Sequence, residues 1–262
     1  MLLAINANNT LTKFALYDGA DQRGFWRIAT QAGRTADEYV VWLAKLLELG
    51  RHDHRAIDAA IIASVVPATV FHLKQLCRDH FGCEPLIVGD PDLDLGMSVR
   101  LDRPQDAGAD RLANAVGGHL AYKGALIVVD FGTATTFDVI AENGDYCGGA
   151  IAPGVQLSLD TLHSATAMLP RIEVAKPANA IGGGTLTAMQ SGIFWGYIGL
   201  IEGLVTRIRL EWGKPMTVIA TGGLAPLFFG ATDMLEELDP DLTMRGLVEI
   251  HRRNANRKAL RA

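Results

Sequence analysis

Apolar and polar positions at the start of the chain predict two strands joined by a polar turn. The apolar run LLAI leads into the polar tip Asn6–Thr10, and a second apolar run then returns to an Asp18-Gly19 turn. Residues that tolerate unusual backbone angles gather at such tips, so this segment is predicted to be a hairpin. Helical spacing follows at 35–49, a buried-strand run at 59–66, and helical spacing again at 67–81.

The same plan recurs 124 residues later, in the segment ALIVVDFGTATTFDVIAENG that starts at Ala125. It reads as an apolar strand, a Gly/Thr turn and a returning strand. The two tips align when Asn6 is placed on Asp130, so that Asn8 and Asn9 fall on Gly132 and Thr133. A duplication of this length predicts two similar α/β lobes, because the repeats of a solenoid are much shorter.

The second half continues with a Gly/Pro loop expected at 148–154, a long helix at 184–212 and a buried strand at 216–223. A C-terminal helix containing MRGLVEIHRRN completes it. The boundary is expected near Gly117 to Gly124, which gives an N-terminal lobe of residues 1–117 and a C-terminal lobe of residues 118–262. A cleft is expected between the two lobes.

Composition excludes several classes of protein. The chain has 262 residues, 49% of them hydrophobic and 20% charged, which is the balance of a soluble globular protein. The net charge of -5, with both signs mixed along the length, offers no basic stripe for nucleic acid. No apolar stretch reaches the length of a membrane span, and no signal peptide is recognised. The three cysteines form no CxxC pair, so we expect a cytoplasmic protein without a disulfide framework or a zinc site.

Three turns at strand ends are rich in Gly, Thr and Asn: Asn6–Thr10, Asp130–Thr136 and Ala220–Gly223. Such turns let backbone N–H groups approach phosphate oxygens, and Thr hydroxyls add donors. A single glycine turn after a strand is usually only a turn. Three of them, two related by duplication, indicate a nucleotide site.

Four segments carry a resemblance to a known family. They are GADRLANA at 108–115, DFGTATTFD at 130–138, GGAIAPG at 148–154, and TAMLPRIE followed by IGGGTLTAMQSGIFWGY up to Tyr197. The chain resembles the type III pantothenate kinases over nearly its whole length. That family belongs to the acetate and sugar kinase, Hsp70 and actin superfamily, so the resemblance implies an α/β fold of two duplicated ribonuclease H-like (actin-like ATPase) lobes.

The resemblance also implies an activity and its ligands. The family phosphorylates pantothenate to 4'-phosphopantothenate with ATP, the first step of coenzyme A biosynthesis. It works as a homodimer with Mg²⁺ or a similar divalent ion and with K⁺ or NH₄⁺. By this resemblance, substrate contacts fall on Gly108, Ala109, Asp110, Arg111 and Thr185, with Asp110 as the catalytic base. ATP contacts fall on Asn6, Ala7, Asn8, Asn9, Thr10, Leu11, Thr12, Lys13 and Thr133, and the monovalent cation falls on Asp130.

The residues by themselves leave simpler roles open. Asp110 follows a glycine and precedes an Ala-rich helical run, so it is either a helix N-cap or a base that accepts a hydroxyl proton. Arg111 is either a solvated helix charge or a forked donor for the substrate carboxylate or the transferring phosphoryl group. Asp130 is either part of a structural turn or a cation ligand. Thr185 is either a helix cap or a substrate contact.

The first loop departs from the family pattern Asp-x-Gly-Asn-Thr, because Asn6 and Asn8 replace the acid and the glycine. Losing the acid weakens the expected attraction for magnesium. Leu101 and the run Gly182–Gly184 also differ from the family at positions near the substrate motifs. Two alternatives follow: a non-catalytic or regulatory homologue that binds nucleotide or pantothenate, and a kinase for another small hydroxylated substrate.

Overall fold

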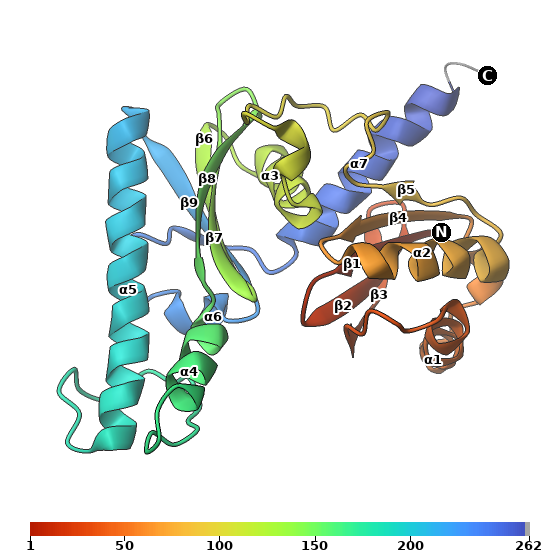
Figure 1. Cartoon of the computed structure of the whole chain (residues 1–262). Coiled ribbons are helices and arrows are strands. Elements are labelled where there is room, and N and C mark those ends of the chain that lie inside the picture. The colour runs from red at the N-terminus through yellow and green to blue at the C-terminus, as the bar shows by residue number, and fades with distance from the viewer. Residues whose placement is uncertain (260–262) are drawn as a thin grey trace. The chain divides into compact units, whose positions relative to one another are not determined.

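The computed structural model describes residues 1–259, and the described chain forms two compact units (Figure 1). The first unit comprises residues 1–120 together with the chain from Leu242 onward. The second comprises residues 121–241. The last three residues of the predicted C-terminal lobe, 260–262, lie outside the described part. No helix in the described chain is long and apolar enough to span a bilayer.

The first unit is built on a five-stranded sheet with the order β3-β2-β1-β4-β5. β1 pairs antiparallel with β2 and parallel with β4. β2 pairs antiparallel with β3, and β4 pairs parallel with β5. The strands are β1 (Leu2–Ala7), β2 (Leu11–Asp18), β3 (Asp21–Ala29), β4 (Ala59–Ser64) and β5 (Leu86–Ile87). The predicted hairpin and the strand within 59–66 are therefore confirmed.

The second unit repeats this plan with the order β8-β7-β6-β9-β10. Its strands are β6 (Ala125–Phe131), β7 (Ala134–Ile140), β8 (Tyr146–Pro153), β9 (Met216–Gly222) and β10 (Glu237–Leu238). β6 pairs antiparallel with β7 and parallel with β9, as β1 does with β2 and β4. The predicted α/β fold class of two duplicated ribonuclease H-like lobes is confirmed.

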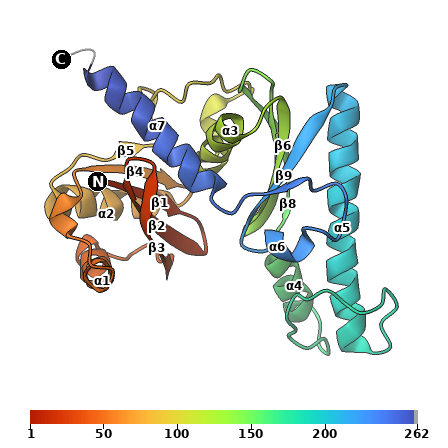
Figure 2. The same ribbon diagram turned by 180° about the vertical axis from the view of Figure 1, so that it is seen from behind.

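Helices cover both faces of the first sheet. They are α1 (Ala36–Leu49), η1 (His54–Ala56), α2 (Pro67–Gln75), η2 (Leu76–His80), η3 (Pro104–Asp106), α3 (Ala109–Ala121) and α7 (Leu242–Ala259). On one face, Leu3 and Ile5 of β1 share a buried cluster with Tyr39 and Leu43 of α1. On the other face, α7 packs against β1 and β4 (Figure 2).

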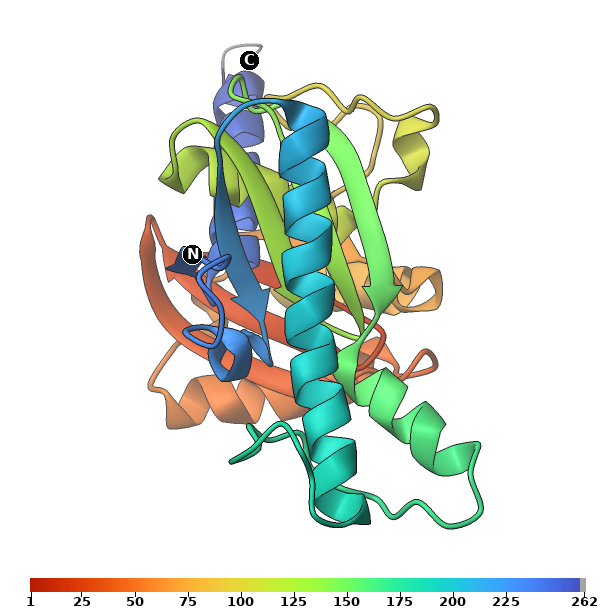
Figure 3. The same ribbon diagram turned by 90° about the vertical axis from the view of Figure 1, so that its left-hand side faces the viewer.

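The second unit carries α4 (Val155–Ser164), α5 (Thr185–Trp212) and α6 (Ala225–Phe228). α5 runs along one face of the second sheet (Figure 3). Its residues Phe194 and Ile201 share a buried cluster with Val129 of β6 and Phe228 of α6. The long helix predicted at 184–212 is thus confirmed, with Gly184 as its N-cap.

Two sequence-based expectations differ from the structure. The segment 148–154 was expected to be a loop, yet most of it is β8, which pairs with β7. Gly149 has φ of +150°, and a Cβ there would lie 1.7 Å from the carbonyl oxygen of Phe137, so the glycines serve close strand pairing. The C-terminal helix was expected in the second lobe, but by its contacts α7 belongs to the first unit.

The close approach of α7 to α3 explains why α7 belongs to the first unit. A Cβ at Gly246 would lie 1.9 Å from the carbonyl oxygen of Ala113, and one at Gly117 would lie 2.3 Å from that of Leu242. The buried hydroxyl of Thr243 donates to Oδ1 of Asn114 at 2.6 Å. The two backbones therefore touch, which needs glycine on both helices.

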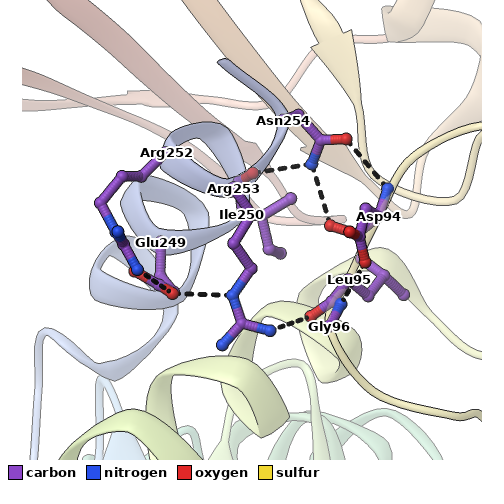
Figure 4. A network of polar contacts seen from close by, with 8 residues as sticks. All are labelled: Asp94, Leu95, Gly96, Glu249, Ile250, Arg252, Arg253 and Asn254. Atoms are coloured by element: carbon purple, nitrogen blue, oxygen red, sulfur yellow. Dashed lines mark hydrogen bonds and ion pairs between the residues drawn. The ribbon is translucent and has the colours of Figure 1, made fainter. Parts of the chain in front are cut away.

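α7 also holds the chain segment that leads toward α3 (Figure 4). Glu249 pairs with Arg252 and Arg253 at 2.7 Å each. Arg253 Nη1 donates to the carbonyl oxygen of Leu95 at 2.9 Å, and the Asn254 amide nitrogen donates to the carbonyl oxygen of Asp94 at 2.9 Å. The segment around residue 95 is thereby tied to the end of the chain.

Candidate active site

The predicted first phosphate loop, residues 6–13, spans the end of β1, the turn and the start of β2. Its turn is closed by the N–H of Asn8, which donates to the carbonyl oxygen of Leu11 at 3.1 Å. The N–H of Val65, just beyond β4, donates to the carbonyl oxygen of Ala7 at 3.1 Å. The carboxyl ends of β1 and β4 therefore lie side by side at this loop.

Asn6 is buried, with 1% of its surface exposed, and its Oδ1 has no hydrogen-bond partner within residues 1–259. The same holds for Oδ1 of Asn8. A buried acceptor left without a donor costs about 1–3 kcal/mol. A hydrated divalent ion brings water donors and positive charge to such oxygens, so the two amides fit a site for the magnesium complex of a nucleotide.

Some of the other residues in the loop are held by hydrogen bonds, and others are exposed to a ligand. Asn9, Thr10 and Leu11 are exposed, so their backbone can be reached by a ligand. The hydroxyl of Thr12 is buried and shares a hydrogen bond of 2.9 Å with the hydroxyl of Thr30. Lys13 is half-buried and lies opposite Asn6 in the β1–β2 register. The Thr12 hydroxyl thus stabilises the hairpin, while the exposed residues at its tip remain accessible to a phosphate group.

The GADR segment lies at the start of α3, next to the end of β4. A Cβ at Gly108 would lie 2.9 Å from Oδ1 of Asp110 and 3.6 Å from Cγ1 of Val65. Because the N–H of Val65 bonds to the carbonyl oxygen of Ala7, the Asp110 carboxylate and the first phosphate loop belong to one edge of the same sheet.

Asp110 is held inside the first helical turn, because α3 begins at Ala109. Its Oδ1 accepts the backbone N–H of Arg111 at 2.8 Å. Negative charge is stabilised in the first turn of a helix, which favours the carboxylate form that a base requires. Asp110 and Arg111 are both half-buried, whereas Ala109 is buried. Their heads are therefore accessible at the carboxyl end of the first sheet.

The second phosphate loop repeats the first with one residue fewer. The N–H of Gly132 donates to the carbonyl oxygen of Ala134 at 3.0 Å. Gly132 and Thr133 are exposed. A Cβ at Gly154 would lie 2.1 Å from the carbonyl oxygen of Thr133, so the chain that enters α4 passes directly against this loop. The glycine fixes the loop while leaving its outer side open.

Asp130 lies against the third glycine turn. It pairs with Thr221 of β9, and a Cβ at Gly222 would lie 2.5 Å from Oδ1 of Asp130. Gly222 has φ of +93°, a backbone conformation that favours glycine. The half-buried carboxylate therefore lies against the backbone of Gly222, and a carboxylate oxygen is a ligand that suits a hard cation.

Residues 1–259 contain no group of three His, Cys, Asp or Glu side chains arranged to hold a metal ion. The donors available to such an ion in the first unit are the orphan oxygens of Asn6 and Asn8.

Thr185 is the exposed first residue of α5. The hydroxyl of Thr187, not of Thr185, caps this helix: it accepts the N–H of Gly184 at 3.1 Å and donates to its carbonyl oxygen at 3.0 Å. The cap role considered from the sequence thus belongs to Thr187. Thr185 lies in the second unit, so the structure of the first unit does not itself bring it to Gly108–Arg111.

Sequence reasoning missed the contacts that position these residues. The α3–α7 crossing at Gly117 and Gly246 and the Asn114–Thr243 hydrogen bond were not foreseen. The small residues of ANAVGG and MRGL were the available signal, because they permit close helix packing. They predict a contact only when the two helices are already known to pack together. That meeting joins segments more than 120 residues apart, as the 129-residue separation of Asn114 and Thr243 shows.

Comparison with known proteins gives a consistent result over the whole chain. A family model described as type III pantothenate kinase matches residues 2–207. A type III pantothenate kinase of Paramagnetospirillum magneticum is 62% identical over 255 residues, covering 97% of this chain and 98% of the relative. That of Rhodospirillum rubrum is 61% identical over 254 residues, covering 97% of this chain and 99% of the relative.

Solved structures show the fold at much lower identity. A Campylobacter jejuni protein described as a Baf family transcriptional activator has a TM-score of 0.62 and 20% identity, covering 97% of this chain and 99% of that one. The activator of the 2-hydroxyisocaproyl-CoA dehydratase from Clostridium difficile, with bound ADPNP, has a TM-score of 0.54 and 12% identity, covering 99% and 97%. The family model over residues 2–207 and the relatives from Paramagnetospirillum magneticum and Rhodospirillum rubrum, each covering 97% of the chain, show that the chain belongs to the type III pantothenate kinase family.

Proposed function

We propose that this chain transfers the γ-phosphoryl group of ATP to the terminal hydroxyl of pantothenate, forming 4'-phosphopantothenate in the first step of coenzyme A biosynthesis. The relatives that are 61–62% identical over almost their full length carry the name of this activity. The observation that carries the proposal is the position of Asp110. Its carboxylate contacts Gly108, and Gly108 packs against Val65, at the sheet edge where the predicted first phosphate loop also lies.

Asp110 is the proposed general base. It accepts the proton of the attacking hydroxyl, and its contact with the N–H of Arg111 fixes the position of the carboxylate. Phosphoryl transfer depends chiefly on positioning and on stabilising charge. A base held in the first turn of α3, at the edge that carries the phosphate loop, meets the positioning requirement.

Arg111 and Thr185 are proposed to hold the substrate with Gly108 and Ala109. A guanidinium next to the base supplies forked donors either to the pantothenate carboxylate or to the transferring phosphoryl group. These two roles predict different kinetics. Loss of a carboxylate contact raises KM for pantothenate, whereas loss of phosphoryl stabilisation lowers kcat.

The nucleotide is proposed to contact residues 6–13 and Thr133. The accessible backbone of the two hairpin tips supplies N–H donors for phosphate oxygens, as the exposure of Asn9 and Thr133 supports. When bound, magnesium neutralises phosphate charge, and Asn6 and Asn8 offer it buried oxygens that lack partners within residues 1–259. Asp130, framed by Gly222, is the proposed ligand of K⁺ or NH₄⁺.

We further propose a homodimer that works in the cytosol. Exposed apolar side chains on α4 and at the start of α5, Leu157 and Leu186, are the proposed contacts with a second copy. All three cysteines are free thiols, which suits a reducing compartment.

The test is a coupled assay that follows ADP release with purified chain, ATP, Mg²⁺, K⁺ and pantothenate, together with mass spectrometry of the product. A product heavier by one phosphoryl group supports the proposal. Binding of pantothenate and ATP without turnover would instead support the regulatory homologue. Turnover of another hydroxylated compound but not of pantothenate would support a kinase for a different small substrate.

A second arm separates the roles of Arg111. Pantothenol, which lacks the carboxylate, is compared with pantothenate in the parent and in Arg111→Ala. If Arg111 holds the carboxylate, the variant handles both compounds with similar KM. If it stabilises the phosphoryl group, kcat falls for both compounds by the same factor.

A further inference from the structure

Two buried thiols meet where η2 ends. Cys77 lies within η2 and is fully buried, and Cys83 follows six residues later with 8% of its surface exposed. Gly82, in the left-handed region with φ of +65°, turns the chain back on itself between them. The N–H of Cys83 then donates to the carbonyl oxygen of Cys77 at 3.1 Å. The turn therefore sets one cysteine directly against the other.

This backbone contact brings the pair within the reach of a disulfide. With standard bond lengths added to the 3.1 Å contact, the two Cα atoms are no more than about 7 Å apart. Disulfides usually join Cα atoms roughly 4.4–6.8 Å apart. Both side chains also pack in the same buried cluster. Both are nevertheless free thiols in this structure.

The surroundings of the two sulfurs differ in a way that assigns them different roles. Cys83 lines a pocket of about 370 Å³, together with Asp58, Gly82, Glu84 and His251. Cys77 is absent from the lining, although it packs in the same cluster as Cys83. A small reagent in the pocket therefore meets Cys83 first.

The pKa values of the two thiols favour the same order of reaction. Interaction with Cys77 lowers the pKa of Cys83, against the opposing effect of burial. Interaction with Cys83 raises the pKa of Cys77, as burial also does. Thiolate is the nucleophilic form, so attack begins at Cys83.

We propose that Cys83 and Cys77 form a peroxide-sensitive dithiol, in which Cys83 is the attacking thiol and Cys77 the resolving thiol. The Cys83 thiolate attacks one oxygen of a hydroperoxide, the O–O bond breaks, and hydroxide (or alkoxide) leaves. Cys83 is then a sulfenic acid. The Cys77 sulfur attacks the Cys83 sulfur, the S–O bond breaks, and water leaves with the Cys77 proton. Two thiols are oxidised, and one hydroperoxide is reduced.

The pair lies away from the proposed phosphate site. The pocket is lined by Asp58, Ala59 and Ala60, at the amino end of β4, whereas Val65 and the first phosphate loop lie beyond its carboxyl end. The length of β4, six residues, separates the two ends by roughly 16 Å. The dithiol is thus independent of the proposed transfer reaction.

The test uses the fully reduced whole chain treated with one equivalent of hydrogen peroxide. Remaining thiols are alkylated, and the chain is digested with trypsin without reduction. Cleavage after Lys74, Arg78 and Arg100 separates the two cysteines, so a disulfide joins the peptides Gln75–Arg78 and Asp79–Arg100. The linked pair is expected, with Cys147 alkylated, and dithiothreitol is expected to restore both thiols. Alkylation of both Cys77 and Cys83, or thiols that dithiothreitol does not restore, would overturn the proposal.

Variants test the order of attack. Cys77→Ala is expected to stop at the sulfenic acid and to give a dimedone adduct on Cys83, while Cys83→Ala is expected to give no adduct on Cys77. Cys147→Ala is the matched control and is expected to form the disulfide at the parent rate. A dimedone adduct on Cys77 in Cys83→Ala would reverse the assignment and contradict it. The digest of the parent chain decides the disulfide even if a variant does not fold.

Discussion

The crossing of α3 and α7 makes Gly246→Ala the most informative single change outside the proposed active site. The added Cβ would lie 1.9 Å from the carbonyl oxygen of Ala113 and 3.1 Å from the backbone nitrogen of Gly117. Both contacts are to backbone, so no side-chain rotation relieves them. The helices must separate by about 1 Å, which also disturbs the Asn114–Thr243 hydrogen bond.

The free-energy estimate combines two opposing terms. Alanine in place of glycine in a helix interior favours folding by about 1 kcal/mol. Overpacking costs about 1–3 kcal/mol, and more where backbone has to move. We expect the clash to dominate and to lower the unfolding free energy by about 2 kcal/mol, which corresponds to a Tm roughly 4–8 °C lower.

The same displacement is expected to reach Asp110, because it lies in the first turn of α3. A misplacement of about 1 Å can reduce a rate on the order of 100-fold. We expect kcat of Gly246→Ala to fall by roughly 10- to 100-fold, while KM for ATP changes less. Circular dichroism melts and the coupled assay, run well below the Tm, measure the two effects separately.

Gly199→Ala provides the matched control. Gly199 lies in the interior of α5, and a Cβ there meets nothing within 4 Å. The control is expected to keep or slightly raise the unfolding free energy, by up to about 1 kcal/mol. If Gly246→Ala melts like the parent and turns over at the parent rate, the close α3–α7 contact and its link to Asp110 are refuted.

Three further predictions concern charge. Asn6→Asp is expected to reduce the Mg²⁺ concentration that gives half-maximal rate by about 10-fold or more, because a buried carboxylate attracts the ion by about 4 kcal/mol before desolvation is subtracted; an unchanged requirement would contradict a magnesium role for this position. Asp130→Asn is expected to remove most of the rate increase given by K⁺ over Na⁺, and an undiminished increase would place the ion elsewhere. For Glu249, the hydrogen bond from Arg252 lowers the folded-state pKa, so its contribution to stability is present above its ordinary pKa and is lost as pH falls through the folded value. Urea unfolding of Glu249→Gln is therefore expected to show a deficit of about 1–2 kcal/mol at pH 7 that shrinks as pH approaches 3, and a pH-independent deficit would refute the charge argument.

Local pattern was sufficient to predict much of the fold. The apolar run before Asn6 and its repeat before Asp130 predicted both hairpins, because strand and turn signals act over a few residues. The expected loop at 148–154 was wrong because glycine usually marks a turn. Here Gly149 instead lets β8 approach the carbonyl oxygen of Phe137, a contact that depends on a partner strand.

The unit to which α7 belongs could not be predicted from local sequence pattern for a similar reason. Its helical spacing was visible, but its partner α3 lies more than 120 residues earlier, and a contact of that separation leaves no periodic trace. The candidate site shows the same contrast. The Gly and Thr turns led to the predicted phosphate loops from the sequence alone. The position of Gly108 and Asp110 near Val65 could be known only from the folded chain.

The proposed role of Asp110 is tested most directly by the rate of pantothenate phosphorylation in Asp110→Asn, a change that keeps the side chain's size and removes its basicity. General base catalysis typically contributes 10²- to 10⁴-fold. The account predicts a fall in kcat on the order of 10²-fold or more, with ATP binding and the melting temperature close to those of the parent. A variant that turns over pantothenate at the parent rate would contradict it.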